Sequence, residues 1–170
     1  MRKLLLLCGA VLVSAAAPAP KSLVAPDSAI KPVSARLAQE GAAALAKGQV
    51  TVAFDAYQAA AAADPKNRGA FIGMARASQA QGLPGKAVKF YREALQLEPT
   101  DLVAIEGQGE ALVQRGAKTR ALANLDRLKQ LCGNCAQVGQ LASFIAKAPA
   151  TVQQTADAAK PDSAKPVVKN

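Results

Sequence analysis

Between residues 34 and 133, small and apolar residues recur every three or four positions, which is the spacing of one face of an α-helix. The pattern is clearest from Arg68 to Leu97, where it predicts two amphipathic helices separated by a short turn. The expected inner faces are Phe71, Met74, Ala75 and Ser78 on the first helix, and Ala87, Val88, Tyr91, Ala94 and Leu95 on the second. Pro84 stands where the second helix should begin, a position at which the missing N–H of proline costs nothing. This segment is therefore expected to form a helical hairpin.

The hairpin pattern occurs three times, at a constant step of 34 residues. Four columns share the step: Gly48, Gly82 and Gly116; Ala53, Ala87 and Ala121; Tyr57, Tyr91 and Leu125; and Pro65, Pro99 and Gly133. A period of this length is the signature of a repeat array. The 34 places of each unit are numbered here from Ser34, Arg68 and Leu102.

The three units predict six helices in all. The first helices are expected at Ser34–Lys47, Arg68–Gln81 and Asp101–Arg115, and the second helices at Val50–Ala63, Pro84–Leu97 and Lys118–Leu131. The glycine at place 15 should end each first helix, because glycine adopts a left-handed backbone conformation without steric cost. No single hairpin can bury its apolar face alone, so neighbouring units are expected to stack.

The repeated residues resemble the tetratricopeptide repeat. The matching residues are Gly41, Ala75 and Gly109 at place 8, Ala53, Ala87 and Ala121 at place 20, Tyr57, Tyr91 and Leu125 at place 24, Ala60, Ala94 and Leu128 at place 27, and Pro65 and Pro99 at place 32. The resemblance implies an all-α fold, a right-handed superhelical solenoid of helix pairs. It also implies a concave face built mainly by the first helices, which in that family commonly binds an extended peptide or a partner helix.

The repeats are expected to form one domain, residues 34–148, made of repeats 34–67, 68–101 and 102–133 and a cap helix at residues 135–147. Asn134 is expected to cap that last helix, whose apolar stripe is Val138, Leu141, Ala142 and Ile145. Residues 18–33 contain four prolines and are expected to be an extended linker. Residues 149–170 are polar and are expected to be a disordered tail.

Residues 1–17 have the pattern of a secretory signal peptide. Arg2 and Lys3 precede an apolar run, Leu4–Val13, and small residues follow it. The run is too short to span a bilayer, so the mature protein is expected to have no membrane span and to be periplasmic or secreted. A lipid anchor on Cys8 is not favoured, because Leu7 stands where a small residue is needed.

Composition argues against catalysis and against nucleic-acid binding. The chain has no His and no Trp, and is 51% hydrophobic but only 4% aromatic. The lack of His removes the commonest acid/base group near neutral pH and the commonest metal ligand, and we expect neither a metal nor a cofactor. The net charge of +9 is spread along the chain. Nucleic-acid binding usually needs basic residues gathered on one face, so none is expected.

Cys132 and Cys135 form the only reactive-looking motif. A second C-x-x-C and a histidine are both absent, which disfavours a zinc site. A redox pair remains an alternative, although such pairs normally stand at the start of a helix in a fold that contains strands. In an exported protein the favoured interpretation is a structural disulfide. It would stabilise the turn into the cap helix by roughly 1–3 kcal/mol.

The expected ligand surface follows from the geometry of the repeat. Places 2, 5, 9 and 12 of each first helix should face the concave side. These places hold Ala35, Ala38, Ala42 and Leu45, then Gly69, Ile72, Arg76 and Gln79, then Val103, Glu106, Glu110 and Val113. The first set is small and apolar, so the candidate partner-binding residues are Ile72, Arg76, Gln79, Val103, Glu106 and Glu110.

The functional prediction is a non-catalytic scaffold of the bacterial cell envelope that binds a peptide or a partner protein on its concave face. Two alternatives stay open. One is a thiol–disulfide redox protein that uses Cys132 and Cys135, and the other is a structural spacer between the two proline-containing arms.

Overall fold

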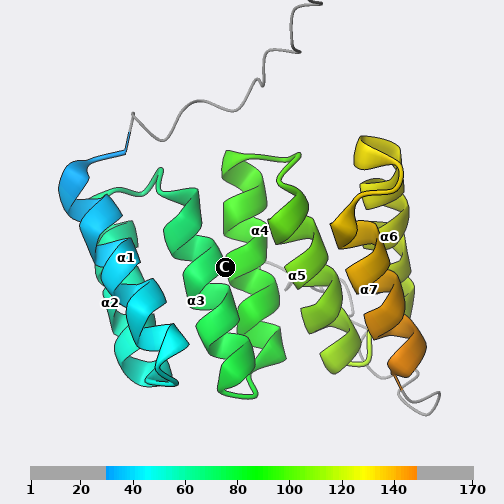
Figure 1. Ribbon diagram of the computed structural model, residues 1–170, viewed down its shortest axis with the longest axis horizontal. Coiled ribbons are helices and arrows are strands. Elements are labelled where there is room, and N and C mark those ends of the chain that lie inside the picture. The colour runs from blue at the N-terminus through cyan, green and yellow to red at the C-terminus, as the bar shows by residue number, and fades with distance from the viewer. Residues whose placement is uncertain (1–29, 149–170) are drawn as a thin grey trace, which may run out of the picture.

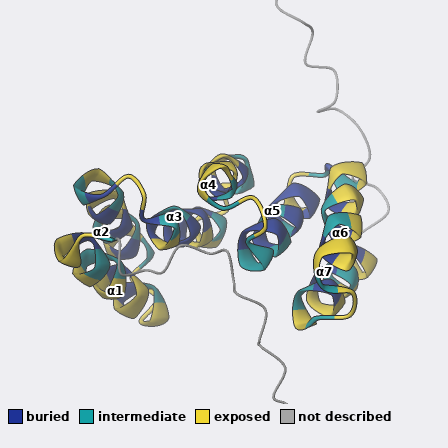
Figure 2. Cartoon of the chain, turned by 90° about the horizontal axis from the view of Figure 1, so that it is seen from above, coloured by how far each residue is buried: buried dark blue, intermediate teal, exposed yellow. Residues whose placement is uncertain are grey.

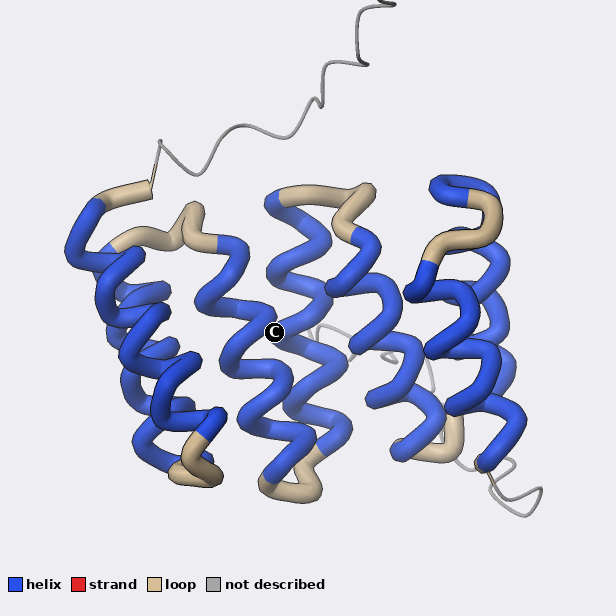
Figure 3. Tube along the Cα trace, in the orientation of Figure 1, coloured by secondary structure: helices blue, strands red, loops and turns tan. Residues whose placement is uncertain are grey.

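The computed structural model describes residues 30–148, in which every regular element is a helix (Figures 1 and 3). The seven helices are α1 (Pro32–Ala46), α2 (Val50–Ala63), α3 (Arg68–Ala80), α4 (Pro84–Leu97), α5 (Leu102–Gln114), α6 (Lys118–Cys132) and α7 (Ala136–Lys147). The predicted signal peptide 1–17, nearly all of the predicted linker and the predicted tail 149–170 lie outside the described residues. The expected all-α helical repeat is confirmed.

The helices form three hairpins followed by α7, and consecutive helices pack side by side (Figure 1). The backbones of α1, α3, α5 and α7 lie close to one another in that order. Within residues 30–148, the second helices α2, α4 and α6 do not approach each other in the same way. The spacing between hairpins is therefore narrower on the side of the first helices, which makes that side the concave one. Figure 2 shows α2 and α4 apart from one another, with α3 between them.

Glycine ends each first helix, as expected from place 15. Gly48, Gly82 and Gly116 have φ values of 72°, 71° and 85°, in the left-handed region that only glycine adopts easily. The residue after each glycine then donates its N–H back to the helix, for example Leu83 N to Ser78 O at 2.9 Å. The turn into the second helix is thus determined by a single residue per repeat.

The last place of each unit caps the next first helix. The side chains of Asn67 and Asp101 accept hydrogen bonds from the N–H groups of Ala70 and Ala104, at 3.1 and 2.8 Å. The N-cap of α7 is Cys135, one period after Asp101, and its side chain makes no capping bond. The expectation that Asn134 caps this helix was wrong because the period places the cap one residue later, and Asn134 is exposed.

The first helix starts earlier than expected. Pro32 is the first residue of α1, two residues before the predicted start, so Pro32 and Val33 belong to the helix and not to the linker. Proline is favoured at this position because it needs no hydrogen-bond acceptor there. The preceding Lys31 N–H is held by Asp64, which accepts it at 2.9 Å.

Tyrosines and glycines interlock between adjacent repeats. A Cβ on Gly73 would come within 2.2 Å of the Tyr57 ring, and a Cβ on Gly107 within 2.4 Å of the Tyr91 ring. Gly73 and Gly107 both occupy place 6, so each tyrosine at place 24 fills the space that the next unit leaves open. Tyr57 is 6% exposed and Tyr91 is 2% exposed. This glycine column was overlooked in the sequence, although it follows the same period.

Between the third repeat and α7, the sizes of the two contacting residues are reversed. Place 24 of the third unit is Leu125, and place 6 of the following helix is Leu141. Leu141 is fully buried, and a Cβ on Gly109 would come within 2.6 Å of its side chain. Leu125 at place 24 is smaller than the tyrosines, and Leu141 at place 6 is larger than the glycines. Through Leu141, α7 packs into the same hydrophobic core as Leu125.

Candidate functional site

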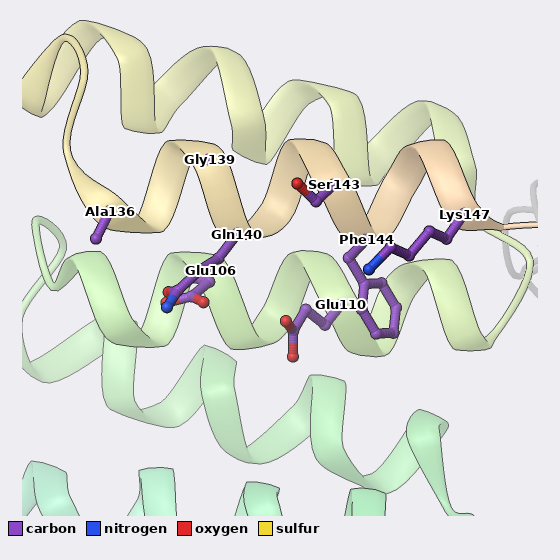
Figure 4. A pocket seen from close by; sticks show the side chains of 8 residues that line it. All are labelled: Glu106, Glu110, Ala136, Gly139, Gln140, Ser143, Phe144 and Lys147. Atoms are coloured by element: carbon purple, nitrogen blue, oxygen red, sulfur yellow. The ribbon is translucent and has the colours of Figure 1, made fainter.

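The concave side carries a groove of about 570 Å³ between α5 and α7 (Figure 4). Its α5 wall is formed by Glu106 and Glu110. Its α7 wall is formed by Ala136, Gly139, Gln140, Ser143, Phe144 and Lys147. In Figure 4 the side chain of Gln140 points toward Glu106, and Phe144 lies beside Glu110. We call this surface the acidic groove.

The two glutamates stand one helical turn apart and face the same space, as places 5 and 9 predict. Both are half-buried, and neither forms a salt bridge with another residue of 30–148. Burial raises the pKa of the Glu106 carboxyl, the Glu110 carboxylate raises it further, and Arg76 opposes both effects. Burial also raises the pKa of Glu110, again opposed by Arg76. The groove therefore holds two carboxylates without a salt-bridge partner among residues 30–148, and Lys147 lies on its other wall.

Tyr91 of α4 is buried against Gly107 of α5, the helix that carries the two glutamates. Its hydroxyl donates a hydrogen bond to Gln79 Oε1 at 2.8 Å, and Gln79 Nε2 donates to Gln114 Oε1 at 3.4 Å. Burial raises the pKa of Tyr91 to about 12, with Glu110 and Glu106 adding to the effect and Arg76 opposing it. Gln79 thus connects α3, α4 and α5, and its amide is already engaged within the protein.

The six predicted binding residues divide into three groups. Glu106 and Glu110 line the groove, and Arg76 is exposed on the neighbouring α3, close enough to influence both carboxyls. Gln79 is half-buried and serves as the bridge just described. Ile72 is only 9% exposed and belongs to the hydrophobic core, against which Val103 is also packed. Ile72 therefore offers little surface to a ligand, and Val103 is only partly exposed.

Six of the eight residues that line the acidic groove come from α7, a helix to which we assigned only a capping role. Counting 34 residues on from Leu102 makes Ala136 the first place of a fourth unit. Places 5, 9 and 12 of that unit are Gln140, Phe144 and Lys147, and all three line the groove. The concave-face rule would have found them if it had been extended by one period.

The two cysteines lie apart from this groove, at the turn between α6 and α7. Their Cα atoms lie 5.7 Å apart, and Gly133 in the same turn has φ of 65°. A disulfide can bridge this Cα separation. The disulfide itself stays a prediction, which a thiol count on unreduced protein would test: no free thiol is expected, and two would contradict it.

Metal-binding clusters and membrane-spanning helices were looked for among residues 30–148. No group of three or more His, Cys, Asp or Glu side chains is arranged to hold a metal ion there. No helix in the same range is both long enough and apolar enough to cross a membrane.

No protein-family model matches the chain, and neither does any curated protein. Solved structures do match it. The first tetratricopeptide repeat (TPR) domain of Spaghetti (RPAP3), bound to the HSP90 peptide SRMEEVD, has a TM-score of 0.64 at 20% identity, covering 70% of this chain and 95% of that one. The Sgt2 TPR domain of Aspergillus fumigatus has a TM-score of 0.64 at 23% identity, covering 69% and 79%.

A third similar structure is the type III secretion chaperone SycD of Yersinia enterocolitica, in complex with a peptide of the translocator YopD. Its TM-score is 0.60 at 18% identity, covering 74% of this chain and 92% of that one. Identities of this size establish the fold alone. They confirm the resemblance that the 34-residue period indicated: the chain has the fold of a tetratricopeptide repeat domain.

Proposed function

We propose that this chain is a non-catalytic protein-interaction module that holds an extended peptide segment of a partner protein in the acidic groove. The observation that carries the proposal is the groove itself, about 570 Å³ on the concave side, with two half-buried carboxylates that lack a salt-bridge partner among residues 30–148.

An extended peptide suits this groove because its backbone groups need partners. Glu106 and Glu110 on one wall and Gln140, Ser143 and Lys147 on the other can accept or donate hydrogen bonds along the length of the groove. Phe144 adds an apolar and aromatic contact between them. A peptide backbone bound here can therefore exchange its bonds with water for bonds with the protein.

The similar structures support peptide binding but indicate a different ligand charge. The RPAP3 domain was solved with SRMEEVD and SycD with a peptide of YopD, so domains of this fold do hold peptides. SRMEEVD contains three acidic residues, and in the present groove such a peptide would meet Glu106 and Glu110. Because Glu106 and Glu110 have no salt-bridge partner among residues 30–148, they favour a ligand that carries Lys or Arg, since an opposite charge relieves the cost of burying them.

We also propose that this binding takes place outside the cytoplasm, in the cell envelope or beyond it. The support is the signal-like pattern of residues 1–17, together with a pair of cysteines whose positions are compatible with a disulfide. Detection of a shortened chain in the periplasmic fraction or the medium would agree with this, and a full-length cytoplasmic chain would contradict it.

The binding proposal can be tested with short random peptides displayed on phage and selected on the full chain. Selected peptides are then titrated against the wild type, Glu106→Gln/Glu110→Gln and Arg76→Ala. We expect the selected peptides to be rich in Lys or Arg. We expect the double glutamine variant to bind them at least about tenfold more weakly, which corresponds to the loss of one good charge-assisted contact.

Glu93→Gln is the matched control, because it removes a carboxylate from an exposed position on α4. It should bind like the wild type, and all variants should keep the helical circular dichroism spectrum. The proposal is overturned if no peptide is enriched, or if Glu106→Gln/Glu110→Gln binds the selected peptides as tightly as the control does.

A further inference from the structure

A second groove, of about 510 Å³, lies on the other side of the array, between α2 and α4 and above α3. Its main residues are Phe54 and Ala61 of α2, Phe71 and Met74 of α3, and Lys86 and Phe90 of α4. We call it the aromatic groove, because it gathers three of the four phenylalanines of the chain. All three phenylalanines are only half-buried, whereas Met74 at 3% exposure forms the floor.

Lys86 is the only charged residue of this groove. Its Nζ lies 4.0 Å from the centre of the Phe54 ring and 5.9 Å from that of Phe90, and the two rings are 5.7 Å apart. Lys86 makes no salt bridge with any residue of 30–148. The ring faces hold the ammonium group at the groove. An occupant with a carboxylate can therefore pair with Lys86 there.

The equivalent place between α4 and α6, one period further on, carries different side chains. Leu95 replaces Ala61 there and packs against the core, and Ile105 replaces Phe71 and is fully buried. Asn124 replaces Phe90 and donates hydrogen bonds to Ile105 O and Gln108 Oε1, at 3.0 and 3.2 Å. Ala61 therefore contributes less side-chain volume between the second helices than Leu95 does at the same place of the next repeat.

The apolar lining also restricts the conformation of an occupant. Apart from Lys86, Gln58 is the only polar side chain in the groove, and the backbones of α2, α3 and α4 are already hydrogen-bonded within their helices. An extended peptide would leave its own N–H and C=O groups without partners, which is costly when they are buried. A helix satisfies its backbone internally and presents only side chains.

We propose that the aromatic groove binds an amphipathic α-helix of a partner protein, which inserts a leucine-like side chain beside Ala61 and pairs a carboxylate with Lys86. The leucine takes the volume that Leu95 fills in the equivalent place between α4 and α6. The site is separate from the acidic groove, since the two share no residue and lie on opposite sides of the array.

The test uses the full chain and three alanine-based helical peptides. The first carries two leucines four positions apart and a glutamate on the same face, the second has lysine in place of the glutamate, and the third is the first with a central proline. Binding is followed by amide NMR shifts and by calorimetry. We expect the first peptide to bind with shifts in α2 and α4, and the other two to bind at least about tenfold more weakly.

Ala61→Leu is the decisive variant, because it places in the groove the larger side chain that the next repeat has at the equivalent place. It should abolish binding of the first peptide while keeping the thermal stability of the wild type or raising it. Ala59→Leu adds the same side chain at an exposed position of α2 and should bind normally. Lys86→Glu should reverse the preference and favour the lysine peptide.

The proposal is overturned if none of the peptides binds, if Ala61→Leu binds as well as Ala59→Leu, or if the proline peptide binds as well as the first. Analytical ultracentrifugation tests whether a second copy of this chain, rather than a partner helix, fills the groove. A wild-type dimer that Ala61→Leu converts to a monomer would mean that a second copy of this chain fills the groove, and would equally overturn the partner helix.

Discussion

The acidic groove and the aromatic groove are built by the same repeat, yet they differ in position, charge and polarity. The acidic groove lies between two first helices on the concave side and presents side chains that can bond to a peptide backbone. The aromatic groove lies between two second helices and presents rings, a methionine and a single ammonium group. One suits an extended segment and the other suits a helix.

The difference follows from how the hairpins stack. On the concave side the first helices are close together, so residues at places 5, 9 and 12 project between them and decide the chemistry of the surface. On the other side the second helices stand further apart, and the side chains between them must fill the space. Ala61 borders the aromatic groove, whereas Leu95, at the same place of the next repeat, packs against the core. Charged and polar side chains therefore distinguish the groove on one side, and side-chain volume distinguishes the groove on the other.

The largest effect is expected from Leu141→Ala, which should damage the acidic groove and spare the aromatic one. Leu141 is fully buried, so its truncation should lower the free energy of unfolding by about 2–5 kcal/mol. Peptide binding at the acidic groove should weaken because α7 loses its main anchor, whereas helix binding at α2 and α4 should persist. Urea denaturation and the two binding assays measure this.

Gly109→Ala tests the contact between α5 and α7 from the other side. Alone it should destabilise the protein, since its Cβ would meet Leu141 at 2.6 Å. In the Leu141→Ala background the clash is gone, and Gly109→Ala should be neutral or stabilising. Equal effects of Gly109→Ala in both backgrounds would show that Leu141 does not fill this space.

A smaller effect is expected from the glycines that receive the tyrosines. Gly73→Ala and Gly107→Ala would place a Cβ within 2.2 Å of the Tyr57 ring and 2.4 Å of the Tyr91 ring, so each should lower the free energy of unfolding by about 1–3 kcal/mol. Gly107→Ala should disturb the acidic groove more, because Gly107 lies on α5 with Glu106 and Glu110. Gly73→Ala should disturb the aromatic groove more, because Tyr57 packs in one cluster with Met74.

Gly139→Ala is the control for this pair. It lies within α7 with nothing within 4 Å of its added Cβ, and should raise the stability by about 0.5–1 kcal/mol through helix propensity alone. A Gly139→Ala variant that is less stable than the wild type would contradict the packing described between neighbouring repeats. A Gly107→Ala variant that is as stable as the wild type would contradict it too.

The smallest expected effect concerns pH and separates the two grooves by charge. Burial raises the pKa values of Glu106 and Glu110, so the folded chain binds these two protons more tightly than the unfolded chain does. The stability that they contribute is present below the ordinary carboxyl pKa and is lost as the pH rises through the raised values. Glu106→Gln/Glu110→Gln should therefore gain in melting temperature relative to the wild type between about pH 4 and about pH 7.

Exposed Glu93→Gln serves again as the control and should show a smaller change over the same range. Binding of a cationic peptide at the acidic groove should weaken on acidification, beginning at a higher pH than for ordinary carboxylates. A double glutamine variant whose melting temperature follows that of the wild type at every pH would remove the basis for the raised pKa values.

The sequence alone determined the repeat and much of the concave surface. The 34-residue period located six of the seven helices to within two residues, and the glycines at place 15 marked their turns. Helical geometry also sufficed to place Glu106 and Glu110 together on one face. These features are local, because each depends on backbone preferences and side-chain spacing within one hairpin.

Only the tertiary structure decided which of those positions line a groove and where space between the helices stays unfilled. It buried Ile72, engaged Gln79 with Tyr91, and made α7 a wall of the acidic groove by docking Leu141 beside Gly109. It also left the space beside Ala61 unfilled. The physical reason is that burial and empty volume depend on the side chains of two or three neighbouring repeats at once, and no single helical pattern contains that information.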